Sequence, residues 1–417
     1  MNDAPTALPL DRASLFRIAA VHRTPPVPIA GGRITDWLLT KGPRIAREVE
    51  LFGELCWRLV GSGVGLWRAT LHYGTLHPQI QGLAVRWWRD REITEEIHIA
   101  HGAILTSEYT KSPIRPAIER GIAVRHRLDD GEAAGYPLLE SIRRTGGTDY
   151  LALPLNPMRG RFPVATWSTD RPGGFAEADI AALHGIAPAL AAIVDTRASR
   201  RVSTNLLDTY LGIEAGRRIL AGQVQRGQGE GLNAVIMATD LRGFTALSDR
   251  LSGAAMIALL DEYFEAVTGA IHERDGDVLK FIGDGVLAIF PVGEEGDFTS
   301  IAVHALDAGR TILARLDERN VMRRAAGLAQ IRIGIGLHLG EVIYGNVGGF
   351  ERLDFTVIGP AVNLAARLES LTKRLMRPLL TSQAFAAACP LPLASLGYHP
   401  VRGFSEPEEV FGLPESC

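Results

Sequence analysis

Two aspartates in the C-terminal half of the chain have the chemistry and the surroundings of metal ligands. Asp240 follows a buried-type strand that begins at Ala234, and a short turn then leads into a helix. Asp284 lies at the tip of an expected hairpin, between Gly283 and Gly285. Mg²⁺ usually binds through one or two carboxylates plus substrate phosphates, and a pair of ions can activate an attacking oxygen and stabilise a leaving one. Taken singly, each aspartate is better explained as a helix cap or a turn residue.

The elements around these aspartates follow the order strand, helix, strand, strand, helix, strand. After the first strand, apolar runs predict strands at Asp277–Phe281, Val286–Phe290, Ile331–Leu337 and Val342–Gly345. Amphipathic spacing predicts helices over Met256–His272 and Phe298–Val321. This order predicts an α+β, ferredoxin-like (βαββαβ) fold. The strands that carry the two aspartates can be neighbours in such a sheet, which would bring both carboxylates to one rim.

Three segments of this half resemble the signature blocks of class III adenylate/guanylate cyclases. They are Asp240-Leu-Arg-Gly-Phe-Thr, Val278-Leu-Lys-Phe-Ile-Gly-Asp-Gly and Phe355-Thr-Val-Ile-Gly-Pro-Ala-Val-Asn-Leu-Ala-Ala-Arg-Leu. They occur in the family's order and at its approximate spacing, and the resemblance covers about residues 233–413. It implies conversion of ATP to 3′,5′-cyclic AMP and diphosphate, assisted by two Mg²⁺ or Mn²⁺ ions per active site.

The resemblance also implies a role for each residue that matches the family's motifs. Asp240 and Asp284 would bind the metals, and Asn363 and Arg367 would stabilise the transition state. The implied substrate-binding residues are Lys280, Thr356, Phe244, Thr245 and Arg402. Many relatives carry a second lysine near the C-terminus that reaches the triphosphate. Phe404 stands at that position here, so Arg402 is the candidate replacement and weaker ATP binding is expected. No general base is evident.

The residue types at positions 280 and 356 favour adenine. Lysine only donates hydrogen bonds and suits a ring nitrogen of adenine, whereas the Thr356 oxygen can accept from the exocyclic amine. A guanine-specific site would favour an acceptor such as glutamate at position 280. The alternatives are therefore a guanylate cyclase, which these two residues argue against, and a non-catalytic nucleotide-binding regulator, which the presence of all six principal site residues argues against. Many relatives have aspartate at position 356. The threonine in this chain resembles the family subgroup that includes bicarbonate-responsive members.

The spacing of Asn363 and Arg367 places both side chains on one face of a helix, since they are four residues apart. A surface salt bridge with Glu369 is the simplest alternative role for Arg367. In the family the active site is shared, with the metal aspartates from one protomer and the purine, asparagine and arginine residues from the other. Because this chain carries both halves, the resemblance implies a homodimer with two shared sites.

Composition restricts the class of protein. The chain has 417 residues, 46% hydrophobic and 22% charged, with a formal net charge of -3. These values predict two or three globular domains and offer no electrostatic argument for nucleic-acid binding. Three scattered cysteines indicate a reducing compartment. No signal peptide or run of about 20 apolar residues is evident, so we expect a cytoplasmic protein without a membrane span.

The N-terminal half has less specific features. We expect a proline-rich flexible arm at 1–35, a sensor domain at 36–197, a helical linker at 198–231 and the catalytic domain at 232–417. Residues 145–197 weakly resemble the end of an α/β GAF-type sensor, which implies an unidentified small-molecule or protein regulator. A metal or haem role for the four histidines of this half is less favoured than hydrogen bonding within the fold. They are His72, His77, His98 and His101.

Overall fold

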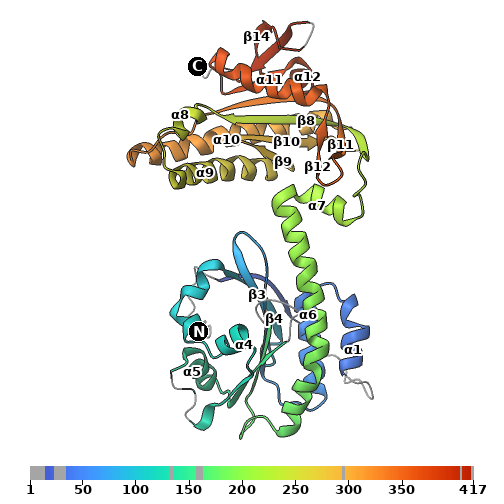
Figure 1. Ribbon diagram of the computed structural model, residues 1–417, viewed down its shortest axis with the longest axis vertical. Helices are drawn as coiled ribbons and strands as arrows, with labels where there is room; N and C mark the ends of the chain where they lie inside the picture. Colours follow the sequence, from blue (N-terminus) through green and yellow to red (C-terminus); the bar gives the residue numbers. More distant parts are fainter. Residues whose placement is uncertain are drawn as a thin grey trace. The chain divides into compact units, whose positions relative to one another are not determined.

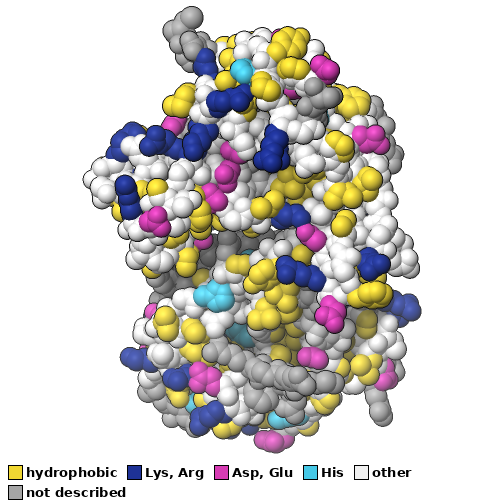
Figure 2. Space-filling view, turned by 45° about the horizontal axis from the view of Figure 1, so that its top comes forward, with side chains coloured by type: hydrophobic (Ala, Val, Ile, Leu, Met, Phe, Trp, Pro, Cys, Tyr) yellow, Lys and Arg dark blue, Asp and Glu magenta, His cyan; other side chains and the backbone are white. Residues whose placement is uncertain are grey.

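The computed structural model describes residues 15–22, 34–130, 133, 135–155, 163–293, 296–403 and 406–414, with the backbone alone for residues 15–22. The chain divides into two compact units, Met1–Leu206 and Leu207–Cys417. Each unit has its own β-sheet with helices on both faces (Figure 1). On the face of the molecule in Figure 2, acidic and basic side chains are interspersed, in keeping with the small net charge.

The N-terminal unit is built on a seven-stranded antiparallel sheet with the order β1-β4-β3-β2-β7-β6-β5. The strands are β1 (Leu15–His22), β2 (Arg68–Gly74), β3 (Ile80–Trp88), β4 (Ile93–Ala100), β5 (Val124–Arg127), β6 (Asp149–Pro154) and β7 (Val164–Thr169). The arm expected over residues 1–35 therefore contains a strand, because an apolar segment pairs with the edge of β4. Residues 1–14 and 23–33 of that arm lie outside the described residues.

The two faces of this sheet are covered by different helices (Figure 1). On one face lie α1 (Ile34–Thr40), α2 (Glu48–Gly61) and α6 (Glu177–Leu211), which share an apolar core with Leu71, Val85 and Trp167. A short 3-10 helix, Gly42–Arg44, separates α1 from α2 at Pro43, because proline interrupts an α-helix. On the other face lie α4 (Arg115–Arg120), α5 (Pro137–Arg144) and a short 3-10 helix, Leu128–Asp130. A 3-10 helix at His101–Leu105 and α3 (Ser107–Thr110) connect β4 to α4 along the chain.

Helix α6 is longer than its apolar stripe predicts. We expect a helix to about Arg197 and a second helical piece from Asn205, but α6 is continuous to Leu211. The basic residues between these pieces bind groups of the sheet and of α2 instead of ending the helix: Arg201 pairs with Glu96 at 2.7 Å. By length and composition alone, α6 could cross a membrane, yet its buried residues, among them Leu183 and Ile193, belong to the core of the N-terminal unit.

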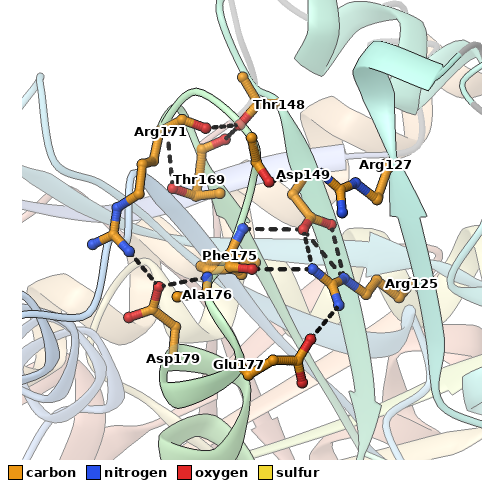
Figure 3. A network of polar contacts seen from close by, with 11 residues as sticks. Arg125, Arg127, Thr148, Asp149, Thr169, Arg171, Phe175, Ala176, Glu177 and Asp179 are labelled. Atoms are coloured by element: carbon orange, nitrogen blue, oxygen red, sulfur yellow. Dashed lines mark hydrogen bonds and ion pairs between the residues drawn. The ribbon is translucent and has the colours of Figure 1, made fainter.

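A buried polar network fixes the start of α6 to the strand ends (Figure 3). The fully buried Asp149 accepts hydrogen bonds from Arg125 Nη2 at 2.8 Å and from the Phe175 backbone N–H at 3.1 Å. Asp179, in the first turn of α6, accepts from Arg171 at 2.7 Å and from the Ala176 N–H at 3.0 Å. The bond from the Ala176 N–H to Asp179, three residues later, corresponds to one half of a capping box and fixes the chain at the entry to α6.

The Asp149→Ala variant should lower the free energy of unfolding of this unit by about 3 kcal/mol, because it removes the buried carboxylate that pairs with Arg125. Urea unfolding followed by tryptophan fluorescence measures this unit alone, since all six tryptophans lie between residues 37 and 167. The control is Asp170→Ala, which breaks the more exposed pair with Arg89 and should cost less than about 1 kcal/mol. Equal costs for the two variants would contradict the prediction.

The C-terminal unit has the predicted ferredoxin-like arrangement. Its four central strands lie in the order β11-β8-β10-β9, and each strand is antiparallel to its neighbours. The strands are β8 (Gly229–Leu241), β9 (Asp277–Ile282), β10 (Gly285–Pro291), β11 (Ile333–Gly348), β12 (Leu353–Ile358), β13 (Leu379–Ser382), β14 (Ala394–His399) and β15 (Glu408–Gly412). The prediction of two strands at Ile331–Leu337 and Val342–Gly345 is wrong, because continuous pairing with β8 makes β11 a single strand.

Helices cover both faces of this second sheet. Helices α9 (Gly253–His272) and α10 (Phe298–Ala325) lie on one face, and α11 (Pro360–Leu375) lies on the other (Figure 1). The shorter helices are α7 (Ile213–Leu220), α8 (Phe244–Ser248) and α12 (Gln383–Ala388). The predicted linker at 198–231 thus contains the end of α6, all of α7 and the start of β8. Ala215 of α7 is buried against the sheet.

Candidate active site

The pairing of β8 with β10 brings Asp240 and Asp284 together. Thr239 lies opposite Val286, so Asp240 lies beside Gly285 at the tip of the hairpin. A side chain at Gly285 would lie 3.4 Å from Asp240 Oδ1 and 2.9 Å from the Thr239 carbonyl oxygen, so glycine is required for this approach. Burial and then the negative charge of Asp284 raise the pKa of Asp240. The two half-buried carboxylates therefore form one electrostatic pair.

The sequence analysis missed the significance of a third carboxylate, Glu369 of α11. Gly334 of β11 pairs directly with Asp240, and a Cβ at Gly334 would lie 2.5 Å from Glu369 Oε1. Glu369 thus lies over the strand next to Asp240. Burial, followed by the charge of Asp240, raises the pKa of Glu369 to about 7. The spacing in the sequence contains a signal for this placement. Two residues turn a helix by about 200°, so Glu369 points away from Arg367 and toward the opposite face of α11.

Helix α11 presents Asn363 and Arg367 to solvent. Its buried face consists of Ala361, Leu364, Ala365, Leu368, Leu371 and Thr372. Asn363 and Arg367 are exposed, as their spacing on one helix face predicts. In the part of the chain that the structure describes, Arg367 forms no ion pair with Glu369 and no hydrogen bond to Asp240 or Asp284. The side chains of Asn363 and Arg367 are therefore accessible to a ligand or to another protein chain.

Lys280 lies on β9 and Thr356 on β12, two strands that do not pair with each other in the sheet. The Lys280 ammonium forms an ion pair with Asp354, which precedes Thr356 by two residues on β12. Asp354 is a second residue that sequence reasoning missed, since the two partners are 74 positions apart. Thr356 is only 6% exposed, and its Oγ1 has no hydrogen-bond partner among the described residues. An ammonium donor and an unpaired hydroxyl thus lie close to each other.

Three further predicted residues lie at the ends of elements. Phe244 and Thr245 begin α8, after Gly243, which has the positive φ of 76° that glycine tolerates best. Phe244 is half-buried and Thr245 is exposed. Arg402 is exposed in the turn after β14, the strand at the opposite edge of the sheet from β9. No hydrogen bond or ion pair between described residues joins Arg402 to the carboxylates, and Phe404 lies outside the described residues.

Other polar groups have structural roles. Tyr263 of α9 shares a buried 2.7 Å hydrogen bond with Thr239, directly before Asp240 in β8. In the N-terminal unit, His98 bonds to Glu96 and His101 to the His77 carbonyl, each at 2.9 Å, as the hydrogen-bonding interpretation predicts. Among the described residues, no three His, Cys, Asp or Glu side chains are arranged to hold a metal ion. A Mg²⁺ ion held by one or two carboxylates usually completes its coordination with waters and substrate phosphates.

Residues 230–377 match the model of the adenylate and guanylate cyclase catalytic domain. This match spans all three motif blocks and the paired aspartates. The C-terminal unit contains a class III cyclase catalytic domain.

Named relatives are similar to part of this chain. The chain is 36% identical over 155 residues to adenylate cyclase 1 of Rhizobium meliloti, covering 37% of this chain and 23% of the relative. It is 39% identical over 140 residues to an adenylate cyclase of Anabaena cylindrica, covering 33% and 27%. The chain therefore spans about a quarter of the length of these relatives. The solved adenylyl cyclase CyaB from P. aeruginosa is 29% identical, covering 46% of this chain and 97% of that one, with a TM-score of 0.40.

The position of Glu369 predicts a pH dependence for the stability of the metal-free cyclase domain. Its pKa is raised from 4.5 to about 7, so the folded state binds more protons than the unfolded state between these values. Stability should fall as the pH rises through this window and level off above it. Glutamine at position 369 does not ionise, so the variant lacks this fall in stability with rising pH. The stability of Glu369→Gln relative to wild type should therefore increase by about 1 kcal/mol, a value reduced because the side chain is partly exposed.

Unfolding in urea with EDTA, followed by circular dichroism at several pH values, measures this difference. The control is Glu318→Gln, which changes an exposed glutamate on α10. A stability difference between Glu369→Gln and wild type that stays constant with pH would contradict the assignment.

Proposed function

We propose that this protein is an adenylate cyclase that converts ATP to 3′,5′-cyclic AMP and diphosphate under control of its N-terminal unit. The observation that carries the proposal is the pairing of Asp240 with Asp284 at one rim of the sheet, within a cyclase domain. Two adjacent carboxylates whose charges repel each other are a suitable site for divalent cations. The matched adenylate cyclases support this choice of reaction.

The donor set fits Mg²⁺ or Mn²⁺, because the carboxylates of Asp240 and Asp284 offer hard oxygen ligands. Two such ions, when bound, would supply activation of the ribose 3′-hydroxyl and neutralisation of phosphate charge. We place Phe244 and Thr245, which follow the turn after Asp240, beside the substrate. Arg402 is the proposed replacement for the lysine that reaches the triphosphate in many relatives. These assignments rest on the motif positions.

The purine would be selected by Lys280 and Thr356. The Lys280 ammonium can donate to a ring nitrogen of adenine, and the Thr356 hydroxyl, buried and unpaired, can accept from the exocyclic amine. Asp354 would hold the lysine in place through their ion pair. This donor and acceptor set disfavours guanine, which would favour an acceptor at position 280. A guanylate cyclase is therefore the less favoured alternative.

The remaining groups would act across a dimer. Arg367 offers a fixed positive fork for the charge that develops on the transferred phosphoryl group, and Asn363 would orient the ribose. Their exposure supports a homodimer in which each protomer gives these two residues to the site of the other. We also propose a cytoplasmic location and a GAF-like sensing role for the N-terminal unit, whose regulator is a small molecule or a protein.

Purified protein incubated with ATP and Mg²⁺ or Mn²⁺ should release cyclic AMP, detected by chromatography, with little cyclic GMP from GTP. Asp284→Ala should lower kcat at least about 100-fold, because a catalytic metal contributes several kcal/mol. A wild-type chain that binds ATP and forms no cyclic product with either metal would support the non-catalytic regulator instead. Preferential turnover of GTP would support the guanylate cyclase.

Complementation tests the shared site. Asp240→Ala and Arg367→Ala chains, each inactive alone, should recover about a quarter of wild-type activity when refolded together in equal amounts. Random pairing makes about half of the dimers mixed, and each mixed dimer holds one intact site of two. The control is a mixture of Asp240→Ala with Asp284→Ala, in which no site is intact. Recovery in this control, or none in the first mixture, would contradict the shared arrangement.

A further inference from the structure

The two faces of the N-terminal sheet differ in polarity. On β2, the side chains of Ala69, Leu71 and Tyr73 face the apolar core with α2 and α6, and those of Arg68, Thr70 and His72 face the opposite way. The second face is nevertheless buried. Its polar residues are Arg68 at 7% exposure, Thr70 at 5%, Glu95 at 6%, Tyr150 at 1%, Thr166 at 6% and Ser168 at 2%. A buried sheet face of this kind needs partners for its polar groups.

Strand register brings these polar residues into one cluster. Arg68 of β2 lies opposite Ser168 of β7, which lies opposite Tyr150 of β6. In the next row, Thr70 lies opposite Thr166 on one side and Arg86 of β3 on the other. Residues directly opposite each other are about 5 Å apart. Guanidinium and hydroxyl groups from four strands therefore surround one point of the buried face.

Arg68 is the unusual member of this cluster. Its guanidinium stacks on the Trp88 ring, 4.8 Å from the centroid. Its Nε has no hydrogen-bond partner, and no carboxylate pairs with it, in the residues that the structure describes. An isolated buried charge is costly, because it has lost the water that would solvate it and has gained no opposite charge in exchange. Arg68 therefore lacks a negative partner that its burial requires.

The neighbouring charges increase this imbalance. Arg91 also stacks on Trp88, at 4.5 Å, and Arg86 lies close by. The nearby carboxylate, Glu95, accepts a 2.7 Å hydrogen bond from Arg86 Nε. Burial, and then the charge of Arg86, lower the pKa of Arg68 to about 9, which still leaves the guanidinium charged at neutral pH. Glu95 is thus already bound by Arg86, and the exposed Arg91 adds further positive charge beside Arg68.

We propose that this buried face binds a small oxyanion, the phosphate or carboxylate group of a regulatory ligand, with Arg68 as its principal partner. The guanidinium suits such a group because its planar donors match two oxygens. The Tyr150 hydroxyl lies on the same buried face, since Tyr150 is in register with Ser168 and Arg68, and it can donate to the same anion. His72, whose pKa is lowered to about 3 by burial and by Arg68 and Arg86, stays neutral there.

The experiment measures thermal unfolding of the full chain by tryptophan fluorescence, which monitors only the N-terminal unit. The probes are sodium phosphate and sodium acetate, each compared with sodium chloride at the same ionic strength. One of the two anions should raise the Tm by about 5 °C at saturation, because ligand binding to the folded state stabilises it. A response to phosphate indicates a phosphorylated ligand, and a response to acetate indicates a carboxylate.

Arg68→Met tests the assigned partner. It should abolish the anion-specific increase in Tm while leaving the Tm in chloride unchanged or higher, because the unpaired charge is removed. The control is Arg58→Met, whose guanidinium also stacks on a tryptophan, Trp37, but pairs with Glu54. This variant should lower the Tm and keep the anion response. General salting effects would appear equally in all variants.

Three results would overturn the proposal. They are no difference between either anion and chloride in the wild type, a full anion response in Arg68→Met, or a Tm in chloride that falls further in Arg68→Met than in Arg58→Met. If Arg68→Met does not fold, Tyr150→Phe replaces it and should weaken the apparent anion affinity several-fold. An unchanged affinity in that variant would count against the site. None of these results depends on cyclase activity.

Discussion

The close packing of α11 on β11 is the constraint on which the cyclase domain depends. A Cβ at Gly336 would lie 2.2 Å from the Ala365 carbonyl oxygen, and one at Gly334 would overlap the side chain of Glu369. Because both positions are glycine, α11 can lie directly on the strand beside Asp240. The same helix directs Asn363 and Arg367 outward. The packing of α11 on β11 thus sets the position of Glu369 on one side of the helix and of Asn363 and Arg367 on the other.

This packing also concentrates negative charge at one rim of the sheet. Asp240, Asp284 and Glu369 come from three different elements, and the charges of the first two contribute to the raised pKa of Glu369. In a metal-free protein such a cluster is destabilising, because each carboxylate raises the cost of ionising the others. Bound divalent cations would relieve this repulsion. The proposed metal site therefore coincides with the rim of the sheet where the metal-free domain has the most unfavourable electrostatic energy.

The N-terminal unit has the opposite imbalance. One face of its sheet packs an apolar core against α6, and the other buries Arg68 near Arg86 and Arg91, with the nearby Glu95 bound to Arg86. A ligand that supplies negative charge would stabilise this unit. The polar network around Asp149 joins strands of the same sheet to the first turn of α6. Asp149 of this network and Tyr150 of the proposed anion site are adjacent residues of β6.

The sequence by itself determined the local features of the protein. Periodicity and turn residues predicted the order of elements in the cyclase domain, the Asp284 hairpin and the outward face of α11. The motif blocks identified the family. What depends on distant residues was decided only by the tertiary structure: the Lys280–Asp354 pair, the place of Glu369 beside Asp240, and the burial of Arg68 without a carboxylate. Local patterns report which face of an element is apolar, whereas the partners of a polar group depend on how strands and helices from separate parts of the chain pack together.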